Sequence, residues 1–278
     1  MILNMFCIEN LSFSLYYNNR RKQSFNEKRE ENRMNYTKEY FAFLQKKLEE
    51  AASTQEENIK LAADMIIESV YNAGSFYVFG SGHSHMVAEE LYTRAGGLMF
   101  VKGILLPELM LHQSYIKSTY LERVSGYAEA IMEIYPICAK DTLLVISNSG
   151  RNNVPIEMCL EAQKRGAKVI ALTSLRHSKA VSSRHVSGKR LFEIADLVLD
   201  NQAEIGDASF EIAGGDTPVA GISDFIGIAI AQTIVATTAA KIVEKGMQPP
   251  IFRSANVDIS DEYWARVREF VENGRNIK

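Results

Sequence analysis

The stretch VISNSGRNNVPIEM, residues 145–158, indicates a strand, a polar loop and a helix in immediate succession. Its first residues are β-branched and apolar, as in a buried strand, and they run directly into small polar residues and a glycine. Beyond this loop, Pro155 stands in the first turn of the predicted helix and Gly166 follows its end, the positions at which helices favour these residues. Small residues at the end of a buried strand pack poorly. Packing therefore does not explain their presence here, and we expect them to have another role.

The same order of strand, loop and helix recurs along the chain. Short apolar segments predict strands at 75–82, 98–104, 141–149, 167–174 and 197–201. Strands without clean alternation that are separated by helices are typical of a parallel sheet covered on both faces. We therefore expect an α/β fold, a three-layer αβα sandwich around a five-stranded parallel sheet with right-handed crossovers.

Helical patterns flank this sheet. Apolar residues recur at spacings of three and four over 36–72, where Ser53 and Thr54 ahead of two glutamates predict a capped restart, hence two helices or one that bends. A long loop is predicted after the fifth strand. Residues 219–245 predict a nearly apolar helix, whose surface fits burial against a second subunit in a homodimer or homotetramer.

The first 33 residues differ in composition from the rest of the chain. They hold a short aromatic start and then a run dense in Asn, Arg, Lys and Glu, without the pattern of a signal peptide. We predict that residues 1–33 are a disordered or spurious N-terminal extension. Residues 34–278 are then expected to form a single domain.

Composition narrows the classes of function. The formal net charge of −3 gives no bulk attraction to nucleic acid or to an anionic membrane, and neither is expected as a partner. No segment was expected to reach the roughly 18 apolar residues of a membrane span. The three scattered cysteines favour a reducing cytoplasm, and the five histidines form no zinc pattern, so we expect no metal and no cofactor.

Two predicted strands end in loops of one kind. The first loop supplies Ser81, Gly82 and Ser84, and the loop in the opening stretch supplies Ser147, Asn148, Ser149, Gly150 and Asn152. Each loop precedes a helix, whose free N–H groups and positive dipole end attract anions, and hydroxyls donate to phosphate oxygens. Ser174, after the fourth strand, is a weaker instance. Helix capping is the alternative role for each of these residues.

Familiar nucleotide motifs do not fit these loops. In the first loop His85 stands where a third glycine of a dinucleotide fingerprint belongs, and the chain has no GxxxxGK[ST] sequence. A nicotinamide or ATP enzyme is therefore not expected.

These residues carry a resemblance to a known family. The order strand–GSGHS–helix, strand–SNSGRN–helix and strand–TS, over about 36–246, resembles the sugar isomerase (SIS) domain of phosphoheptose isomerase and related proteins. The C-terminal QPPIFRSANVD, 248–258, is similar to the UPF0309 family of single-domain SIS proteins. The resemblance implies a phosphorylated sugar ligand and an oligomer. The family commonly has Ser or Thr where this chain has Asn152, so an amide would replace one hydroxyl donor.

Proton transfer requires an acid and a base near these loops. The candidates are Glu89 and Glu90 on the first loop's helix, with His83 and His85 in the loop itself. Helical spacing places Glu89 on the face of His85 and pairs Glu90 with Arg94, whereas the resemblance to phosphoheptose isomerase favours Glu90. The two arguments disagree, and both glutamates remain candidates.

The sequence thus predicts a protein that binds a phosphorylated sugar or amino sugar, with isomerase activity as the leading reaction. A phosphosugar lyase or etherase is the next alternative. A third is a non-catalytic sugar-phosphate sensor that acts through a partner protein.

Overall fold

A computed structural model describes residues 35–258 and 260–273. The predicted N-terminal extension, residues 1–33, lies outside them. The chain divides into two compact units, Met1–Gln45 and Lys46–Lys278, and the boundary falls within helix α2 (Tyr36–Tyr71). Among the described residues the first unit contains the start of α2, and the second contains the whole sheet. That residues 34–278 form one domain stays a prediction.

Five parallel strands form the central sheet, in the order β2-β1-β3-β4-β5. Their bounds are β1 (Phe76–Gly80), β2 (Val101–Ile104), β3 (Thr142–Ile146), β4 (Lys168–Thr173) and β5 (Leu197–Asp200). Phe76 pairs with Val101 of β2 and with Thr142 of β3, so the strand order reverses on either side of β1. The predicted five-stranded parallel sheet is confirmed.

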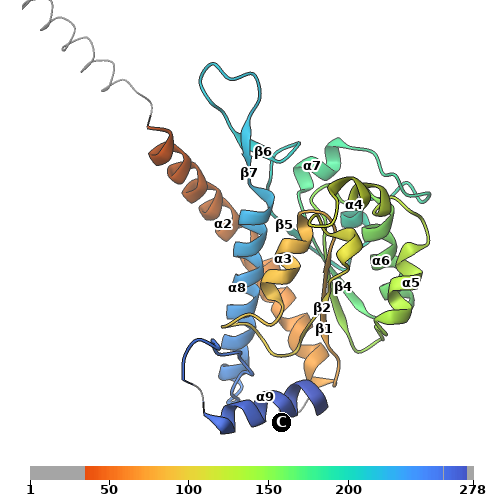
Figure 1. Ribbon diagram of the computed structural model, residues 1–278, viewed down its shortest axis with the longest axis vertical. Coiled ribbons are helices and arrows are strands. Elements are labelled where there is room, and N and C mark those ends of the chain that lie inside the picture. The colour runs from red at the N-terminus through yellow and green to blue at the C-terminus, as the bar shows by residue number, and fades with distance from the viewer. Residues whose placement is uncertain (1–34, 259, 274–278) are drawn as a thin grey trace, which may run out of the picture. The chain divides into compact units, whose positions relative to one another are not determined.

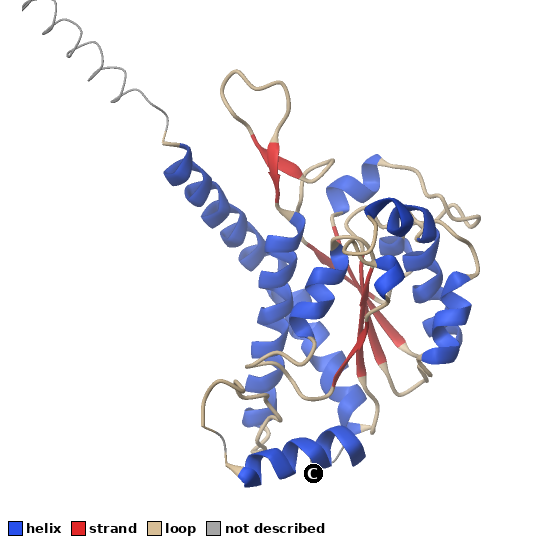
Figure 2. Cartoon of the chain, viewed as in Figure 1, coloured by secondary structure: helices blue, strands red, loops and turns tan. Residues whose placement is uncertain are grey.

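Helices cover both faces of this sheet (Figures 1 and 2). On one side lie α3 (Ser84–Leu91) and α8 (Ser223–Glu244), and on the other α5 (Tyr127–Ile134) and α6 (Asn153–Lys164). Every residue of β1 and β3 is buried, which is why these strands are apolar without alternation. The predicted three-layer αβα arrangement is therefore confirmed.

Shorter elements complete the fold. They are η1 (Pro107–Leu109), α4 (Tyr115–Leu121), α7 (Leu175–Ala180), η2 (Leu191–Glu193) and α9 (Asp261–Asn273). The segment expected to be a long loop contains an antiparallel hairpin, β6 (Ala208–Phe210) and β7 (Val219–Gly221). Asp207 joins this hairpin to α8: its carboxylate accepts from the N–H groups of Ile222 at 3.0 Å and Ser223 at 2.8 Å.

Two helix predictions differ from the structure, one in the middle of α2 and one at the end of α3. Of the two outcomes expected near Ser53, two separate helices is wrong: Ser53 Oγ and Thr54 Oγ1 donate back to the carbonyl of Glu50, at 3.0 and 2.8 Å, and α2 continues as one helix. Helix α3 ends at Leu91, because Tyr92 has an extended backbone, whereas the adjacent glycines Gly96 and Gly97 favour a helix end five residues later.

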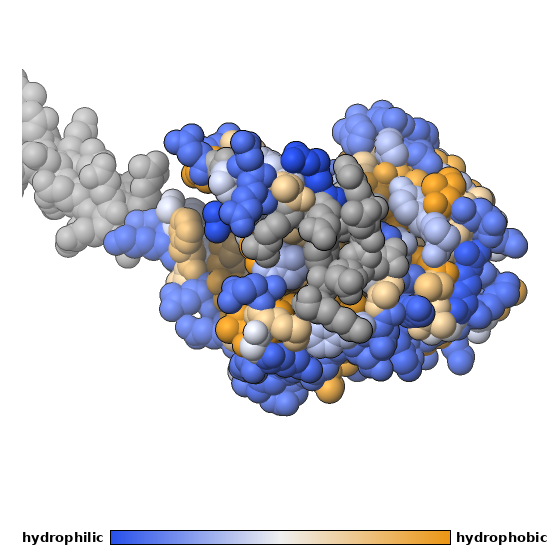
Figure 3. Space-filling model, turned by 90° about the horizontal axis from the view of Figure 1, so that it is seen from below, coloured by the Kyte–Doolittle hydropathy of each residue, from blue (hydrophilic) through white to orange (hydrophobic). Residues whose placement is uncertain are grey.

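The apolar helix α8 overturns the expectation that no segment is long enough to span a membrane, since by length and composition alone it could do so. It is packed as a core helix: a Cβ built on Gly227 would lie 3.4 Å from Val87 Cγ2 on α3 and 3.7 Å from Leu172 on β4. Viewed from below, hydrophilic residues cover much of the described surface, with hydrophobic residues in smaller patches (Figure 3).

Candidate functional site

The candidate site lies at the carboxyl ends of β1 and β3. These strands are neighbours, and the helices that follow them lie on opposite faces of the sheet. In open α/β sheets this reversal of strand order leaves a crevice between the two strand-to-helix loops, where ligands bind. The β1–α3 loop (81–83) and the β3–α6 loop (147–152) both leave the sheet at this point, directly after the paired residues Gly80 and Ile146. The chain thus brings the two predicted polar loops side by side.

Glu122, directly after α4, connects the two loops. Its Oε2 accepts a hydrogen bond from Ser81 Oγ at 3.0 Å, and its Oε1 accepts from Asn152 Nδ2 at 2.7 Å. Its main-chain oxygen also accepts from the N–H of Val154, in the first turn of α6, at 3.0 Å. One carboxylate therefore spans the distance between the loops.

The environment of Glu122 favours its protonated form. Burial raises the pKa of the carboxyl above its usual value, although the hydrogen bonds from Ser81 and Asn152 oppose this shift. A carboxyl group with a raised pKa between two polar loops at the ends of neighbouring strands is suited to proton transfer.

Glycines allow the tight geometry of the β1–α3 loop. A Cβ on Gly80 would lie 2.4 Å from the carbonyl oxygen of Ser84, so only glycine lets α3 begin this close to the strand. Gly82 has a φ of +59° and donates its N–H to Leu109 O at 2.9 Å. Ser84 is the first residue of α3, and no described residue hydrogen-bonds to its hydroxyl.

The β3–α6 loop is held by its own hydrogen bonds. Ser147 Oγ accepts from the N–H of Gly150 at 3.2 Å, and the carbonyl of Asn148 accepts from Thr173 Oγ1 at 3.1 Å. Asn148 Oδ1 accepts from Asn201 Nδ2 at 3.2 Å. In the described part of the chain, the Ser149 hydroxyl and the N–H of Ser149 have no such partner. Ser149 is thus one residue of this loop whose hydroxyl and N–H are available to an anion.

Asn152 has its amide directed to protein groups. The residue is buried, Nδ2 donates to Glu122, and Oδ1 accepts from Arg184 Nη1 at 2.5 Å. An arginine guanidinium is therefore brought to the loop position where the resemblance led us to expect a hydroxyl. The amide orients a carboxylate and a guanidinium at the same time.

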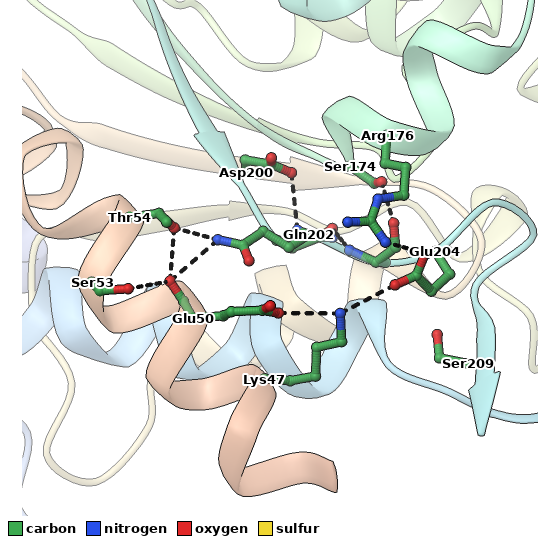
Figure 4. A network of polar contacts seen from close by, with 12 residues as sticks. Lys47, Glu50, Ser53, Thr54, Ser174, Arg176, Asp200, Gln202, Glu204 and Ser209 are labelled. Atoms are coloured by element: carbon green, nitrogen blue, oxygen red, sulfur yellow. Dashed lines mark hydrogen bonds and ion pairs between the residues drawn. The ribbon is translucent and has the colours of Figure 1, made fainter. Parts of the chain in front are cut away.

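Ser174 precedes α7, and its main-chain N–H donates to Asn148 O of the β3–α6 loop at 3.1 Å, but its side chain is directed to other groups. Its buried hydroxyl donates to Ala203 O at 2.7 Å and accepts from the N–H of His177 at 3.0 Å. It belongs to a network at the end of β5 in which Lys47 Nζ contacts Glu204 at 3.1 Å and Arg176 pairs with the same carboxylate (Figure 4). This arrangement gives Ser174 the role of a helix cap.

Of the four predicted proton-transfer residues, two contact each other and the other two do not join them. His85 Nδ1 is hydrogen-bonded to Gly82 O, and its Nε2 lies 3.7 Å from the carboxylate of the half-exposed Glu89. Glu90 points elsewhere, to Arg94 at 2.7 Å and to Gln232 Nε2 at 3.1 Å. His83 is exposed and makes no capping bond through its side chain. The two contacts expected from helical spacing, Glu89 with His85 and Glu90 with Arg94, are confirmed. Of the two glutamates, Glu89 is the one that contacts a residue bonded to the β1–α3 loop.

Sequence reasoning named neither Glu122 nor Asp224 as a site residue. Asp224 is in the first turn of α8, and burial raises its pKa to about 6, an effect that His83 and His85 oppose and Asp207 reinforces. Asp224 is thus electrostatically coupled to the β1–α3 loop. No motif marks either residue, because Glu122 meets its partners across 41 and 30 positions of sequence.

The described residues contain no group of three or more His, Cys, Asp or Glu side chains placed to hold a metal ion. Cys138 is exposed and Cys159 is buried, and both are free thiols. Burial raises the pKa of the Cys159 thiol to about 12, so it is inert at neutral pH.

Comparison with known proteins places this geometry in a family. The SIS domain model matches residues 39–174. A UPF0309 protein of Halalkalibacterium halodurans is 51% identical over 225 residues, which cover 81% of this chain and 93% of that protein. The chain belongs to the UPF0309 family. A second UPF0309 protein, of Geobacillus kaustophilus, is 41% identical with the same share of this chain and 90% of its own length covered.

A solved structure has the same fold at low sequence identity. The phosphoheptose isomerase of Neisseria gonorrhoeae superposes with a TM-score of 0.52 and 19% identity, over 74% of this UPF0309 chain and 97% of the isomerase. This likeness shows the fold. The predicted membership of the SIS and UPF0309 families is confirmed, and sugar-phosphate chemistry is supported at the level of the family.

Proposed function

We propose that this UPF0309 protein binds a phosphorylated sugar or amino sugar between its β1–α3 and β3–α6 loops and isomerises it. The observation that carries the proposal is the bridge from Ser81 through Glu122 to Asn152, which holds the two loops around one crevice. The SIS domain match and the fold shared with a phosphoheptose isomerase support the ligand class.

The phosphoryl group is assigned to the beginnings of α3 and α6. There the hydroxyls of Ser84 and Ser149 have no partner among the described residues, and the N–H of Ser149 is also unused. Hydroxyls and N–H groups at helix N-termini are suited to phosphate oxygens, because they donate short hydrogen bonds within the positive end of the helix dipole.

The reaction moves a proton between the adjacent carbons of an aldose–ketose pair while the oxygens exchange a second proton. In this proposal Glu122 accepts the proton from one carbon and returns it to the other. His85, with Glu89 3.7 Å from its Nε2, serves the oxygens, and Asp224 sets the local charge. The chemistry uses side chains alone and needs no cofactor.

Assembly into a homodimer or homotetramer in the cytoplasm is part of the proposal. An apolar cavity of about 330 Å³ lies between α2 and α8, lined by Ala52, Ile59 and Ile230 among others, and Phe225 and Val243 of α8 are exposed. Such a surface favours burial by a second copy. Sedimentation of the purified protein as a monomer would contradict this part.

The test is a thermal-shift screen of aldose and ketose phosphates. Stabilisation of the wild type by at least one sugar phosphate is expected, and Ser84→Ala combined with Ser149→Ala should abolish it. Ser53→Ala is the control, because its hydroxyl bonds only within α2. Equal shifts in wild type and double variant would refute the proposed site.

Turnover of the stabilising ligand separates the reactions. Interconversion of an aldose and a ketose phosphate supports the isomerase, and loss of a substituent beside the carbonyl supports a lyase or etherase instead. Binding without turnover, together with a stable complex with another protein, would favour a sensor.

A further inference from the structure

Three arginines border the β3–α6 loop. Arg151 belongs to the loop, and Arg184 crosses it: its N–H donates to Arg151 O at 2.8 Å while its guanidinium donates to Asn152 Oδ1. Arg123 follows Glu122, and its carbonyl accepts from Asn153 Nδ2 at 2.8 Å, beside the start of α6. Segments from three parts of the chain thus meet at one loop, and the charges of Arg123 and Arg151 act on the guanidinium of Arg184.

These arginines lack acidic partners. Among the described residues none of Arg123, Arg151 and Arg184 has a carboxylate within 4.0 Å, whereas Arg94, Arg165, Arg176 and Arg190 each form an ion pair. Arg151 Nη2 reaches only Ser182 Oγ, at 3.4 Å, and its Nε is buried without any hydrogen-bond partner. A buried unpaired donor is costly, so it indicates a missing acceptor.

The positive charges also act on one another. Burial, followed by the charges of Arg151 and Arg123, lowers the pKa of the Arg184 guanidinium, and Glu122 alone opposes the effect. Glu122 is itself held toward its neutral form by burial. The loop therefore carries more positive charge than one phosphoryl group requires when the serine hydroxyls and helix N-termini already bind it.

We propose that Arg151 and Arg184 form a second anion subsite beside the phosphate loop, and that the ligand is a phosphorylated sugar with a second anionic group, a carboxylate or a second phosphate. The inference rests on the proposed function and narrows its substrate class. Guanidinium groups bind both anions through paired N–H donors, so the shared chemistry is a planar or tetrahedral oxyanion.

Calorimetric titration of two matched ligand pairs tests the subsite at one fixed ionic strength. Glucose 6-phosphate against 6-phosphogluconate tests the carboxylate, and fructose 6-phosphate against fructose 1,6-bisphosphate tests the second phosphate. In at least one pair the ligand with the extra anion should bind ~10-fold or more tightly, the range of a charge-assisted hydrogen bond.

Variants locate the effect. Arg151→Met and Arg184→Met should reduce the preference to about twofold or less, and Arg184→Lys should retain part of it because the charge remains. Lys189→Met is the matched control, since it removes one exposed positive charge from the same segment of chain. Melting temperatures without ligand establish that each variant is folded.

The outcomes separate this inference from the proposed function. If sugar monophosphates bind but the extra anion adds nothing in either pair, the second subsite is overturned and the sugar-phosphate site stands. If Lys189→Met removes the preference for the extra anion as fully as Arg184→Met does, the general positive charge of this segment explains the preference. That result also overturns the second subsite. If no sugar phosphate binds at all, the proposed function itself fails.

Discussion

At the scale of single residues, the crevice depends on carboxyl groups whose ionisation is made unfavourable. Glu122 and Asp224 are both partly removed from water, and burial is the largest cause of the raised pKa of each. A carboxyl with a raised pKa can take up or release a proton more readily at physiological pH, whereas an exposed carboxylate with an ordinary pKa is a weak base. A raised carboxyl pKa also means that the folded protein loses stability as the pH rises and the group ionises.

Replacement of Asp224 by Asn is expected to alter the pH dependence of stability. The folded pKa of about 6 lies above the ordinary aspartate value of 3.8, so the folded state holds the Asp224 proton more tightly. Stability is then lost as pH rises from about 4 through 6. Asp224→Asn should therefore gain on the wild type over this range, by on the order of 1 kcal/mol at pH 7.5 after allowance for partial exposure.

Urea unfolding of both proteins at pH 4.5 and pH 7.5 provides the measurement. The difference in unfolding free energy between variant and wild type should be larger at the higher pH. A difference that is the same at both values would show that Asp224 ionises normally.

Replacement of Glu122 by Gln tests the proton-transfer role. An amide of the same shape cannot accept a proton, so kcat on the stabilising sugar phosphate should fall by roughly 10²–10⁴-fold while the KM changes little. In the wild type, the rate should rise with pH through the raised pKa of Glu122. Glu129→Gln, on the exposed face of α5, should keep full activity. An active Glu122→Gln variant would remove this residue from the mechanism.

At the scale of elements, backbone geometry rather than side-chain chemistry shapes the two loops. Gly82 and Gly150 both have a positive φ, +59° and +56°. Their surroundings differ, because a Cβ on Gly82 meets nothing within 4 Å, whereas a Cβ on Gly150 would approach Ser178 Oγ at 3.1 Å and Leu191 Cβ at 3.2 Å. One glycine serves conformation alone, and the other also serves packing.

This difference predicts unequal effects of alanine. Gly82→Ala should cost about 1–2 kcal/mol, the penalty of a left-handed conformation for an L-residue. Gly150→Ala should cost more, because overpacking adds roughly 1–3 kcal/mol. Chemical denaturation of both variants measures the two values. Equal losses would mean that the surroundings of Gly150 relax freely.

At the scale of the whole molecule, the second unit is held together by contacts between segments that are distant in sequence. Lys47 on α2 is buried and bonds to Glu204, after β5, and Glu204 also pairs with Arg176 on α7 (Figure 4). Burial tends to raise the pKa of Glu204, but the hydrogen bonds from Arg176 and Lys47, together with their positive charges, outweigh burial and lower it. One carboxylate thus joins α2, α7 and the segment that leads to the hairpin.

Removal of the Lys47 charge should lower the unfolding free energy more than removal of an exposed lysine charge. Lys47→Met leaves Glu204 with a single partner and should cost about 1–2 kcal/mol of unfolding free energy. Lys60→Met, which breaks an exposed pair with Glu56 and Glu57 on the same helix, should change stability hardly at all. Thermal unfolding of the two variants in parallel checks the contrast. A loss in Lys60→Met as large as in Lys47→Met would contradict it.

The sequence alone determined the layers, the parallel sheet and the two polar loops, because apolar strand cores, helix spacing and the glycines at strand ends are local patterns. It also placed Glu89 beside His85 and Glu90 beside Arg94, since a helix fixes neighbours four residues apart. Only the tertiary structure decided that Glu122 bridges the loops, that Asn152 orients Arg184, and that Ser174 caps a helix. The contacts of Glu122 and Asn152 join residues 30 to 41 positions apart, and chain packing, which no local pattern records, brings them together.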